Sequence, residues 1–593
     1  MYKNEYERWL AFDLDDPDLK PELESVKDDD EAIKDRFAVS LKFGTAGLRG
    51  VIGAGTNRMN VYVVRQATQG LANWVKTQGG TQTVAISYDS RIKSDVFAKA
   101  AAEVLAANGV KVRIYKALMP VPALSFATRY YNCNAGIMVT ASHNPAKYNG
   151  YKAYGPDGCQ MTDEAADVVY AEIQKTDVLS GARTMSFEEG MAAGLIEYVG
   201  EDCYEALYQA IESRSVRPGL CKTAGLKLVY SPLNGSGLVP VTRVLGDIGI
   251  TDITIVPEQK DPDGNFPTCP YPNPEFREAL QKGLELCEKV QPDLLLATDP
   301  DSDRMGVMAR WQGGFRRLTG NQVGVLMLDY ICHCLSVAGA EARATAASAL
   351  PGSTGRQLAG KIAYKSYVSS PMAEDVARYY GVEMKNVPTG FKNIAAEMER
   401  LKSSGHETDF LFGFEESLGY LYGNYTRDKD GVLAVQMICL MAACLKAKGK
   451  TLFDKMEELY VRHGYSKSLA SSVHFESEMD RENIDMLMKS LFSGQLESLM
   501  GQALECDFSG ADMSLFSGAL PCGDKIIVRP SGTEMKVKIY VYAKSDSGEK
   551  AEEKAKRMLS ESEAFVQDFC GGRNLAERRY ALKIDTKAKK GIL

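Results

Sequence analysis

The chain has 593 residues, too many for one compact core, and a usual domain size of roughly 100 to 200 residues predicts three to five domains. Hydrophobic residues make up 45% of the chain and charged residues 25%, which is typical of a soluble globular protein and argues against a disordered or fibrous class. The formal net charge of -8 argues against a nucleic-acid partner, because binding to a phosphate backbone needs clustered, excess Lys and Arg. An anionic small molecule is still compatible with this charge, since neighbouring groups set the field inside a cleft.

The thirteen cysteines form neither a CxxC pair nor a dense short-period framework, so reduced thiols are expected. The tightest group, Cys332-His333-Cys334, lies in an apolar run from Val323 to Val337 that predicts a buried helix, where thiols are structural more often than metal-binding. The charged segment from Met1 to Leu10 has no signal-peptide core, and no stretch has the roughly 18 continuous apolar residues of a membrane span. We therefore expect a cytoplasmic protein with no membrane partner.

An acidic, helical leader that includes Asp28-Asp29-Asp30-Glu31 opens the chain. Beyond it, short apolar strand-like runs alternate with longer helical patterns, which indicates an α/β fold. In the first unit we expect a helix at Asp95 to Ala107 and strands at Thr83 to Tyr88, Lys111 to Tyr115 and Gly136 to Ala141. The last of these strands leads directly to Ser142.

Two further units follow the same plan without a residue-level repeat. The second has a predicted helix at Leu238 to Leu245 and predicted strands at Leu226 to Tyr230, Ile253 to Val256 and Asp293 to Thr298. The third is predicted to start at Arg343 to Ala349, and its later strand, Asp409 to Phe414, ends at Glu415 and Glu416. Ligands bind at the carboxyl ends of strands in open α/β sheets, so the polar residues after these strands are candidate site residues.

The segment after about Lys450 has a different texture. Strands are predicted at Lys525 to Val528 and Lys536 to Tyr542, followed by a charged helix from Glu549 to Glu563. The basic tail around Lys587 to Lys590 is interpreted as a surface feature.

The first chemical cluster is Thr140-Ala141-Ser142-His143-Asn144-Pro145, with Lys152 ten residues beyond the serine. A serine that accepts a phosphoryl group needs activation and nearby cations, and His143 and Lys152 are suited to both. Taken alone, the same string is also a plain Asn-Pro turn with a capping serine.

The second cluster places Asp299, Asp301 and Asp303 directly after a strand. An EF-hand calcium loop does not fit, because its sixth and twelfth positions would be Arg304 and Arg310 instead of Gly and Glu. Three carboxylates crowded at a strand end repel one another unless a cation neutralises them, so this cluster favours a metal site.

Two more clusters are weaker in isolation. Gly413 to Ser417, with Thr389-Gly390 upstream and Arg427 to Gly431 downstream, suits the vicinal hydroxyls of a sugar, although a helix N-terminus has the same composition. Arg529-Pro530-Ser531-Gly532-Thr533-Glu534 has the parts of a phosphate cradle, although Ser-Gly-Thr is also a frequent hairpin turn.

The order and spacing of these four clusters resemble the α-D-phosphohexomutases, which include phosphoglucomutase and phosphomannomutase. The shared motifs are T-A-S-H-N-P, D-P-D-x-D-R, G-x-E-x-S and R-x-S-G-T, and Gly44 to Gly50 is similar to the family's F-G-T-x-G-x-R-G segment. The resemblance implies a four-domain, heart-shaped architecture with three similar α/β domains that have mixed sheets, and a smaller α+β C-terminal domain. The expected domains are 1–205 with the leader and phosphoserine loop, 206–316 with the metal loop, 317–450 with the sugar loop, and 451–593 with the phosphate loop.

The resemblance also implies a role for each motif residue. Ser142 would be the phosphoserine, and a Mg²⁺ would be held by Ser142, Asp299, Asp301 and Asp303. Arg49 and Arg304 would steady the transferring group, and His143 and Lys152 would be candidates for acid/base work. The substrate would be bound by Thr389, Gly390, Glu415, Ser417, Lys429, Arg529, Ser531, Gly532 and Thr533.

Within the family, T-G-F-K at Thr389 to Lys392 with F-E-E at Phe414 to Glu416 resembles the long branch that contains the second type of phosphoglucomutase and phosphopentomutase. Phe414 stands where the family often has glycine, and Ser417 is retained where the branch also allows alanine, which favours a hexose. The expected activity interconverts hexose 1-phosphate and hexose 6-phosphate, with glucose preferred, glucose 1,6-bisphosphate as intermediate and a monomeric protein. Phosphomannomutase and phosphopentomutase are the alternatives, and a sugar-phosphate hydrolase or sensor would be the rival classes.

Overall fold

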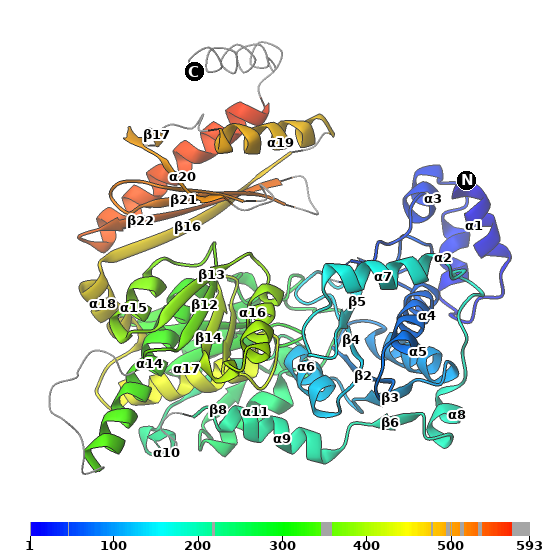
Figure 1. Ribbon diagram of the computed structural model, residues 1–593, viewed down its shortest axis with the longest axis horizontal. Coiled ribbons are helices and arrows are strands. Elements are labelled where there is room, and N and C mark those ends of the chain that lie inside the picture. Colours follow the sequence, from blue (N-terminus) through cyan, green and yellow to red (C-terminus); the bar gives the residue numbers. More distant parts are fainter. Residues whose placement is uncertain are drawn as a thin grey trace. The chain divides into compact units, whose positions relative to one another are not determined.

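The computed structural model describes residues 2–44, 47–215, 220–345, 358–475, 478–493, 498–499, 501–509, 515–531 and 536–571. The chain folds into two compact units, one made of Met1–Ser369 with Val376–Lys455 and the other of Ser370–Asp375 with Met456–Leu593 (Figure 1). Within the described residues, the first unit contains a six-stranded, a five-stranded and a four-stranded sheet, and the second contains another five-stranded sheet. The predicted α/β class, with mixed sheets and a smaller α+β C-terminal domain, is confirmed.

The acidic leader forms helices α1 (Tyr2–Ala11), α2 (Leu19–Ser25) and α3 (Asp30–Phe37), as predicted. Asp29 caps α3, because its side chain accepts a hydrogen bond from the Ala32 N–H. Trp9 is fully buried and lies edge-on to Phe37 and Tyr62, with ring centroids 5.8 and 5.7 Å apart. The leader is therefore part of the hydrophobic core of the first sheet region.

The first sheet has the order β1-β5-β4-β2-β3-β6. Its strands are β1 (Leu48–Val51), β2 (Thr83–Tyr88), β3 (Lys111–Ile114), β4 (Ala135–Val139), β5 (Tyr148–Tyr154) and β6 (Ile196–Tyr198). Strand β2 is parallel to β3 and β4, whereas β5 is antiparallel to β4 and β1. The helices of this region are α4 (Val61–Thr77), α5 (Ser94–Ala107), α6 (Val121–Tyr130), α7 (Asp163–Gln174), α8 (Phe187–Ala192) and α9 (Glu201–Glu212).

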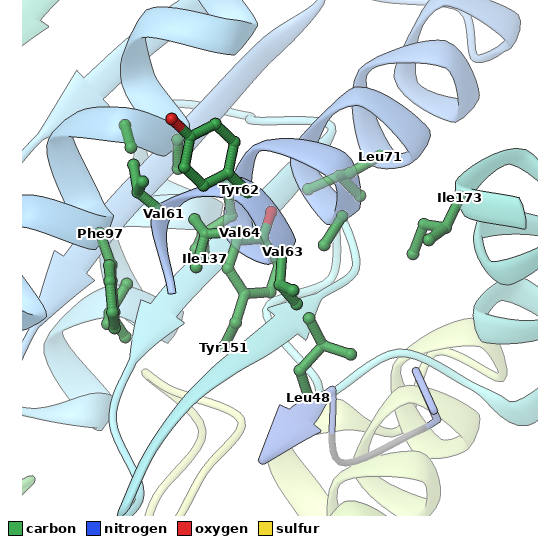
Figure 2. Close-up of a cluster of buried hydrophobic side chains, with 14 of the residues drawn as sticks. Leu48, Val61, Tyr62, Val63, Val64, Leu71, Phe97, Ile137, Tyr151 and Ile173 are labelled. Carbon is green, nitrogen blue, oxygen red and sulfur yellow. The ribbon is translucent and has the colours of Figure 1, made fainter. Parts of the chain in front are cut away.

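Helices cover both faces of this sheet. Ile137 of β4 belongs to the buried hydrophobic cluster that includes residues of α4. Figure 2 shows this cluster, with Ile137 and Tyr151 of β5 labelled. A Cβ at the neighbouring Gly136 would instead meet Thr128 and Leu124 of α6. Because successive strand residues face opposite sides, α4 and α6 lie on opposite faces. Each fully buried aliphatic or aromatic side chain here contributes about 1.5 to 3 kcal/mol.

The second sheet, with the order β11-β10-β9-β7-β8, joins parallel strands to an antiparallel hairpin. Its strands are β7 (Leu228–Ser231), β8 (Ile253–Ile255), β9 (Leu294–Thr298), β10 (Met305–Trp311) and β11 (Gly314–Leu318). Its helices are α10 (Leu220–Ala224), α11 (Leu238–Asp247), α12 (Pro257–Lys260) and α13 (Gln281–Val290). The three strands and the helix predicted for the second α/β unit of the sequence are present, with small shifts at their ends.

The third sheet has the order β13-β12-β14-β15, with strands β12 (Ile362–Ser366), β13 (Glu383–Val387), β14 (Phe410–Glu415) and β15 (Gly419–Tyr422). The associated helices are α14 (Gly320–Thr345), α15 (Met372–Tyr380), α16 (Phe391–Ser403) and α17 (Gly431–Lys446). The predicted start of the third α/β unit, Arg343 to Ala349, falls at the end of helix α14. Arg343 to Thr345 belong to this helix, and residues 346–349 lie outside the described residues.

The sheet of the second unit is antiparallel, with the order β16-β22-β21-β20-β19. Its strands are β16 (Tyr465–His474), β19 (Glu505–Ser509), β20 (Phe516–Ala519), β21 (Lys525–Pro530) and β22 (Lys536–Ser545). Helix α18 (Leu452–His463) precedes the sheet, and α19 (Glu478–Phe492) contacts α20 (Gly548–Gly571) (Figure 1). The strands and charged helix predicted after Lys450 are thus confirmed, and the basic tail lies outside the described residues.

Candidate active site

Three polar clusters follow strand ends in the first unit. Ser142 comes shortly after β4, Asp299 directly follows β9, and Glu415 is the last residue of β14. The structure brings the first two together, since Ser142 Oγ lies 3.2 Å from Asp299 Oδ2. The third cluster is tied to the second, because Met305 N–H donates to the Leu418 carbonyl at 3.2 Å.

Ser142 is buried and has a backbone φ of 53°, in the left-handed region that residues with a Cβ rarely adopt. Such a conformation persists only where the surrounding structure enforces it, and it is frequent at functional sites. The Ser142 Oγ also lies 3.1 Å from Nδ1 of His143. Burial, and then the nearby Arg304 charge, hold the pKa of His143 well below its usual range, so this imidazole is neutral.

Asp299, Asp301 and Asp303 form a buried carboxylate triad whose oxygens lie within 4.8 Å of one another. Burial, followed by the charge of Asp301, raises the pKa of both Asp299 and Asp303. The Oδ1 atoms of Asp301 and Asp303 are buried and make no hydrogen bond with any described residue. Two buried carboxylate oxygens that lack a hydrogen bond, beside a third carboxylate, are a donor set that fits a hard divalent cation.

Two lysines bind this triad from different strands and loops. Lys152 of β5 donates to Asp301 Oδ2 at 2.9 Å, and Lys429 donates to Asp303 Oδ2 at 2.7 Å. Burial alone would raise the pKa of Asp301, but the Lys152 charge and hydrogen bond lower it below the ordinary value. Lys429 is positioned further by Asp428, which lies 3.5 Å away and accepts a hydrogen bond from Tyr154 at 2.9 Å.

The two arginines predicted to steady the transferring group lie in different settings. Arg304 follows the triad, and its backbone N–H donates to Asp299 Oδ1 at 3.0 Å. Its guanidinium Nε lies 3.9 Å from Asp299 and 3.8 Å from Asp303. Arg49 is an exposed residue of β1, opposite Gly150 in the register with β5, two residues before Lys152. Thr45 and Ala46 of the glycine-containing segment that precedes it lie outside the described residues.

The predicted sugar loop brings together residues that are distant in sequence. Glu415 Oε1 accepts a hydrogen bond from the Gly390 N–H at 2.7 Å, so Glu415 and the Thr389-Gly390 turn are adjacent. The next residue, Glu416, accepts a hydrogen bond from Ser366 at 2.9 Å. Burial, and then the Glu415 charge, raise the pKa of Glu416 to about 7. Ser417 is partly exposed.

The predicted phosphate loop belongs to the second unit. Arg529 lies in β21, where it pairs with Lys538 of β22, and Ser531 N–H closes the turn by donating to the Lys536 carbonyl at 2.9 Å. Gly532 and Thr533 lie outside the described residues.

Three domain families match the chain: Phosphoglucomutase/phosphomannomutase, alpha/beta/alpha domain I over residues 40–179, domain II over residues 205–312 and domain III over residues 339–463. A phosphoglucomutase from Staphylococcus epidermidis is 32% identical over 525 residues, which are 86% of this chain and 91% of that protein. The chain belongs to the phosphoglucomutase/phosphomannomutase family. A phosphoglucomutase from Staphylococcus aureus is likewise 32% identical over 551 residues, which are 89% of this chain and 94% of that protein.

Solved structures of family members have the same fold. Parafusin, a phosphoglucomutase from Paramecium, has a TM-score of 0.67 at 19% identity in its open form, over 90% of this chain and 97% of that chain. A phosphoglucomutase/phosphomannomutase family protein from Burkholderia thailandensis has a TM-score of 0.64 at 19% identity, over 90% of this chain and 98% of that chain. The expected phosphohexomutase architecture is therefore confirmed. The described helices of this family member include none that is long and apolar enough to cross a membrane.

Sequence reasoning missed two residues that support the site of this family member. Asp89 and Arg91 follow β2 and contact the loop that carries Ser142. The signal was available, because Asp-Ser-Arg stands directly after a correctly predicted buried strand, where the other candidate clusters also stand.

Proposed function

We propose that this protein is a phosphosugar mutase that interconverts glucose 1-phosphate and glucose 6-phosphate through a phosphorylated Ser142 and a bisphosphorylated sugar. The observation that carries the proposal is the 3.2 Å approach of the Ser142 hydroxyl to Asp299 within the buried carboxylate triad. A serine beside three carboxylates is a poor phosphate carrier unless a cation joins them.

We propose that Asp299, Asp301 and Asp303 hold a Mg²⁺ together with an oxygen on Ser142. The buried Oδ1 atoms of Asp301 and Asp303, which make no hydrogen bond with any described residue, support this assignment, since Mg²⁺ prefers oxygen ligands. When bound, the metal neutralises charge on the phosphoryl group.

Phosphoryl transfer exchanges one oxygen–phosphorus bond for another. A sugar hydroxyl attacks the phosphorus, its new bond forms as the bond to Ser142 Oγ breaks, and the hydroxyl proton must leave. In the net reaction, the proton lost by the sugar hydroxyl is gained by the Ser142 oxygen as its bond to phosphorus breaks. His143, 3.1 Å from Ser142 Oγ, and Lys152 are the proposed acid/base residues for this transfer. Arg49 and Arg304 are proposed to steady the transferring group.

The remaining motif residues are proposed to bind the sugar and its second phosphate. Glu415, Ser417, Lys429 and the Thr389-Gly390 turn would bond to sugar hydroxyls. Arg529, Ser531, Gly532 and Thr533 would bind the phosphate that is not being transferred. The sugar bisphosphate would reorient in the site between two half-reactions, which is why glucose 1,6-bisphosphate is the expected activator.

We propose that the chain has four domains, 1–205, 206–316, 317–450 and 451–593. Each would carry one of the four loops: the phosphoserine, metal, sugar and phosphate loops, in that order.

Intact-protein mass spectrometry and a coupled assay test the proposal. Wild-type protein should carry a fraction with one added phosphate, should convert glucose 1-phosphate and should release little inorganic phosphate. Ser142→Ala should lose both the added mass and the turnover. Full activity of Ser142→Ala would refute the mechanism, and stoichiometric release of inorganic phosphate would identify a hydrolase instead.

A further inference from the structure

The Arg91 side chain is fully buried against the loop that carries Ser142. Its guanidinium Nη1 donates to the carbonyl oxygens of Pro145 and Tyr148 at 3.0 and 2.9 Å. Nη2 donates to the carbonyl oxygen of Ser142 at 2.6 Å and to that of Asn144. One side chain thus donates hydrogen bonds to four carbonyl groups of this loop. The planar guanidinium, with its five N–H donors, is suited to such multiple hydrogen bonding.

Asp89 constrains the same loop from the other side of Ser142. Thr140 Oγ1 donates to Asp89 Oδ2 at 2.6 Å and accepts the Ser142 N–H at 2.8 Å. Asp89 in turn accepts the backbone N–H of Arg91 at 3.0 Å and lies 3.4 Å from its Nε. Both backbone polar groups of Ser142 are therefore fixed, the N–H through Thr140 and the carbonyl by Arg91.

These bonds explain the unusual backbone of Ser142. A φ of 53° is disfavoured for a residue with a Cβ and has to be enforced by its surroundings. With its N–H and carbonyl both held, Ser142 cannot relax to the extended conformation without breaking buried hydrogen bonds. The Oγ is thereby kept near Asp299.

Arg91 also contacts the loop before α13 in the second sheet region. The guanidinium lies 5.1 Å from the ring centroid of the fully buried Phe266. A Cβ at Gly264 would come within 2.8 Å of the Arg91 carbonyl carbon and 2.4 Å of Ile92 N, so this backbone approach leaves no room for a side chain. The residue that holds the serine loop is therefore packed against the sheet region that carries the carboxylate triad.

We propose that Arg91, supported by Asp89, is a positioning residue for phosphoryl transfer, which it serves by holding Ser142 in its left-handed conformation beside the carboxylate triad. This inference rests on the proposed role of Ser142. Arg91 binds backbone carbonyls of the loop, so it acts through Ser142 and its loss should lower kcat much more than it changes KM.

The test compares wild type with Arg91→Met, which removes the donors, and Arg91→Lys, which keeps the charge but not the fork. With glucose 1-phosphate as substrate, we expect kcat of Arg91→Met to fall about 100-fold, the loss typical of a displaced reacting group, with KM within about threefold. The fraction of Ser142 phosphorylated after incubation with glucose 1,6-bisphosphate should fall as well. Arg91→Lys should recover only part of kcat.

Arg310→Met is the matched control. Arg310 also donates to a backbone carbonyl oxygen, that of Pro292 at 3.3 Å from Nε and 3.2 Å from Nη2, but it lies near the end of β10 that is remote from the carboxylate triad. Its loss should lower the Tm and leave kcat unchanged. An equal loss of kcat in both variants, or a kcat of Arg91→Met within about threefold of wild type, would overturn the inference.

If Arg91→Met does not fold, Phe266→Leu takes its place, because it removes the ring under the guanidinium and keeps the core apolar. A lowered kcat with unchanged KM supports the inference, and an unchanged kcat contradicts it. A wild-type protein that never carries phosphate on Ser142 would overturn the proposed function, whereas an active wild type with an equally active Arg91→Met overturns this inference alone.

Discussion

The Ser142 hydroxyl lies 3.2 Å from Asp299 Oδ2, although 157 residues separate the two positions in the chain. The other oxygen of Asp299 accepts the Arg304 N–H at 3.0 Å, so the carboxylate is fixed in place. A phosphate on Ser142 would bring further negative charge to this carboxylate. The repulsion between this phosphate and the carboxylate has to be offset. Because Asp301 and Asp303 add two more carboxylates at the same place, a bound cation can offset it.

The first prediction concerns that cation. Asp301→Asn removes one charged oxygen ligand and also the partner of Lys152, so kcat should fall about 100- to 1,000-fold, as it does when a preorganised electrostatic contact is lost. Chelation of the wild type should abolish turnover, and added Mg²⁺ should restore it. Asp247→Asn, which removes an exposed ion pair with Arg243, is the control and should behave as wild type. Full turnover under thorough chelation would exclude the metal role.

The second prediction concerns sugar choice. Glu415, held by the Gly390 N–H, is proposed to bond to a ring hydroxyl, so glucose 1-phosphate should have the highest kcat/KM, followed by mannose 1-phosphate. Glu415→Ala should narrow the ratio between glucose 1-phosphate and ribose 1-phosphate about 10- to 100-fold, since an unpaired polar group costs about 1 to 3 kcal/mol. Glu397→Ala, whose side chain pairs with Arg400 on α16, should leave the ratio unchanged. A wild type that prefers ribose 1-phosphate would identify a phosphopentomutase.

The third prediction concerns pH and Glu416. Its pKa in the folded protein, about 7, exceeds the ordinary value of 4.5, so folding favours the protonated form. Stability from this group is complete below about pH 4.5 and is lost as the pH rises through 7. Glu416→Gln, which keeps the acceptor for Ser366, should equal wild type near pH 4.5 and be about 1 kcal/mol more stable at pH 8.

Urea denaturation at several pH values measures this difference. The exposed Glu164→Gln is the control and should not alter the pH dependence. Parallel curves for wild type and Glu416→Gln across pH 5 to 8 would show that Glu416 does not titrate in this range.

The fourth prediction concerns the leader. Trp9 is fully buried between Phe37 and Tyr62, so Trp9→Ala should lower the free energy of unfolding by about 3 to 5 kcal/mol. Val39→Ala, at a 60% exposed position just after α3, should change it by less than about 0.5 kcal/mol. Thermal unfolding of both variants gives the comparison. Equal Tm values would mean that the leader is not part of the folded core.

The sequence predicted strands well where apolar runs were bounded by polar residues. Thr83 to Tyr88 is a strand with the predicted ends, and Asp293 to Thr298 differs from β9 by one residue. Strand β5 was not predicted, because Tyr148 to Tyr154 contains Asn, Gly and Lys and resembles a loop. Strand β5 is buried because it pairs with β1 and β4. The strand propensities of its own residues carry no information on that pairing.

In the candidate site too, features that are local in the sequence were predicted and long-range contacts were not. The carboxylate triad could be predicted because its three members are two residues apart in the sequence. The pairings of Lys152 with Asp301 and of Lys429 with Asp303 span 149 and 126 residues, and only the folded chain shows them. The position of Arg91 after a predicted buried strand marked it as a candidate, but its role could not be predicted, because it depends on four backbone carbonyl groups that only the folded chain brings together.

The central claim is that Ser142 donates its phosphoryl group to a sugar, and a single-turnover experiment tests it most directly. Protein labelled with phosphorus-32 on Ser142 is mixed with excess glucose 1-phosphate, quenched at intervals and separated into protein, sugar phosphates and inorganic phosphate. We predict that the label leaves the protein at the rate at which it enters glucose 1,6-bisphosphate and then glucose 6-phosphate. Label that stays on the protein during turnover, or leaves it as inorganic phosphate, would contradict the claim.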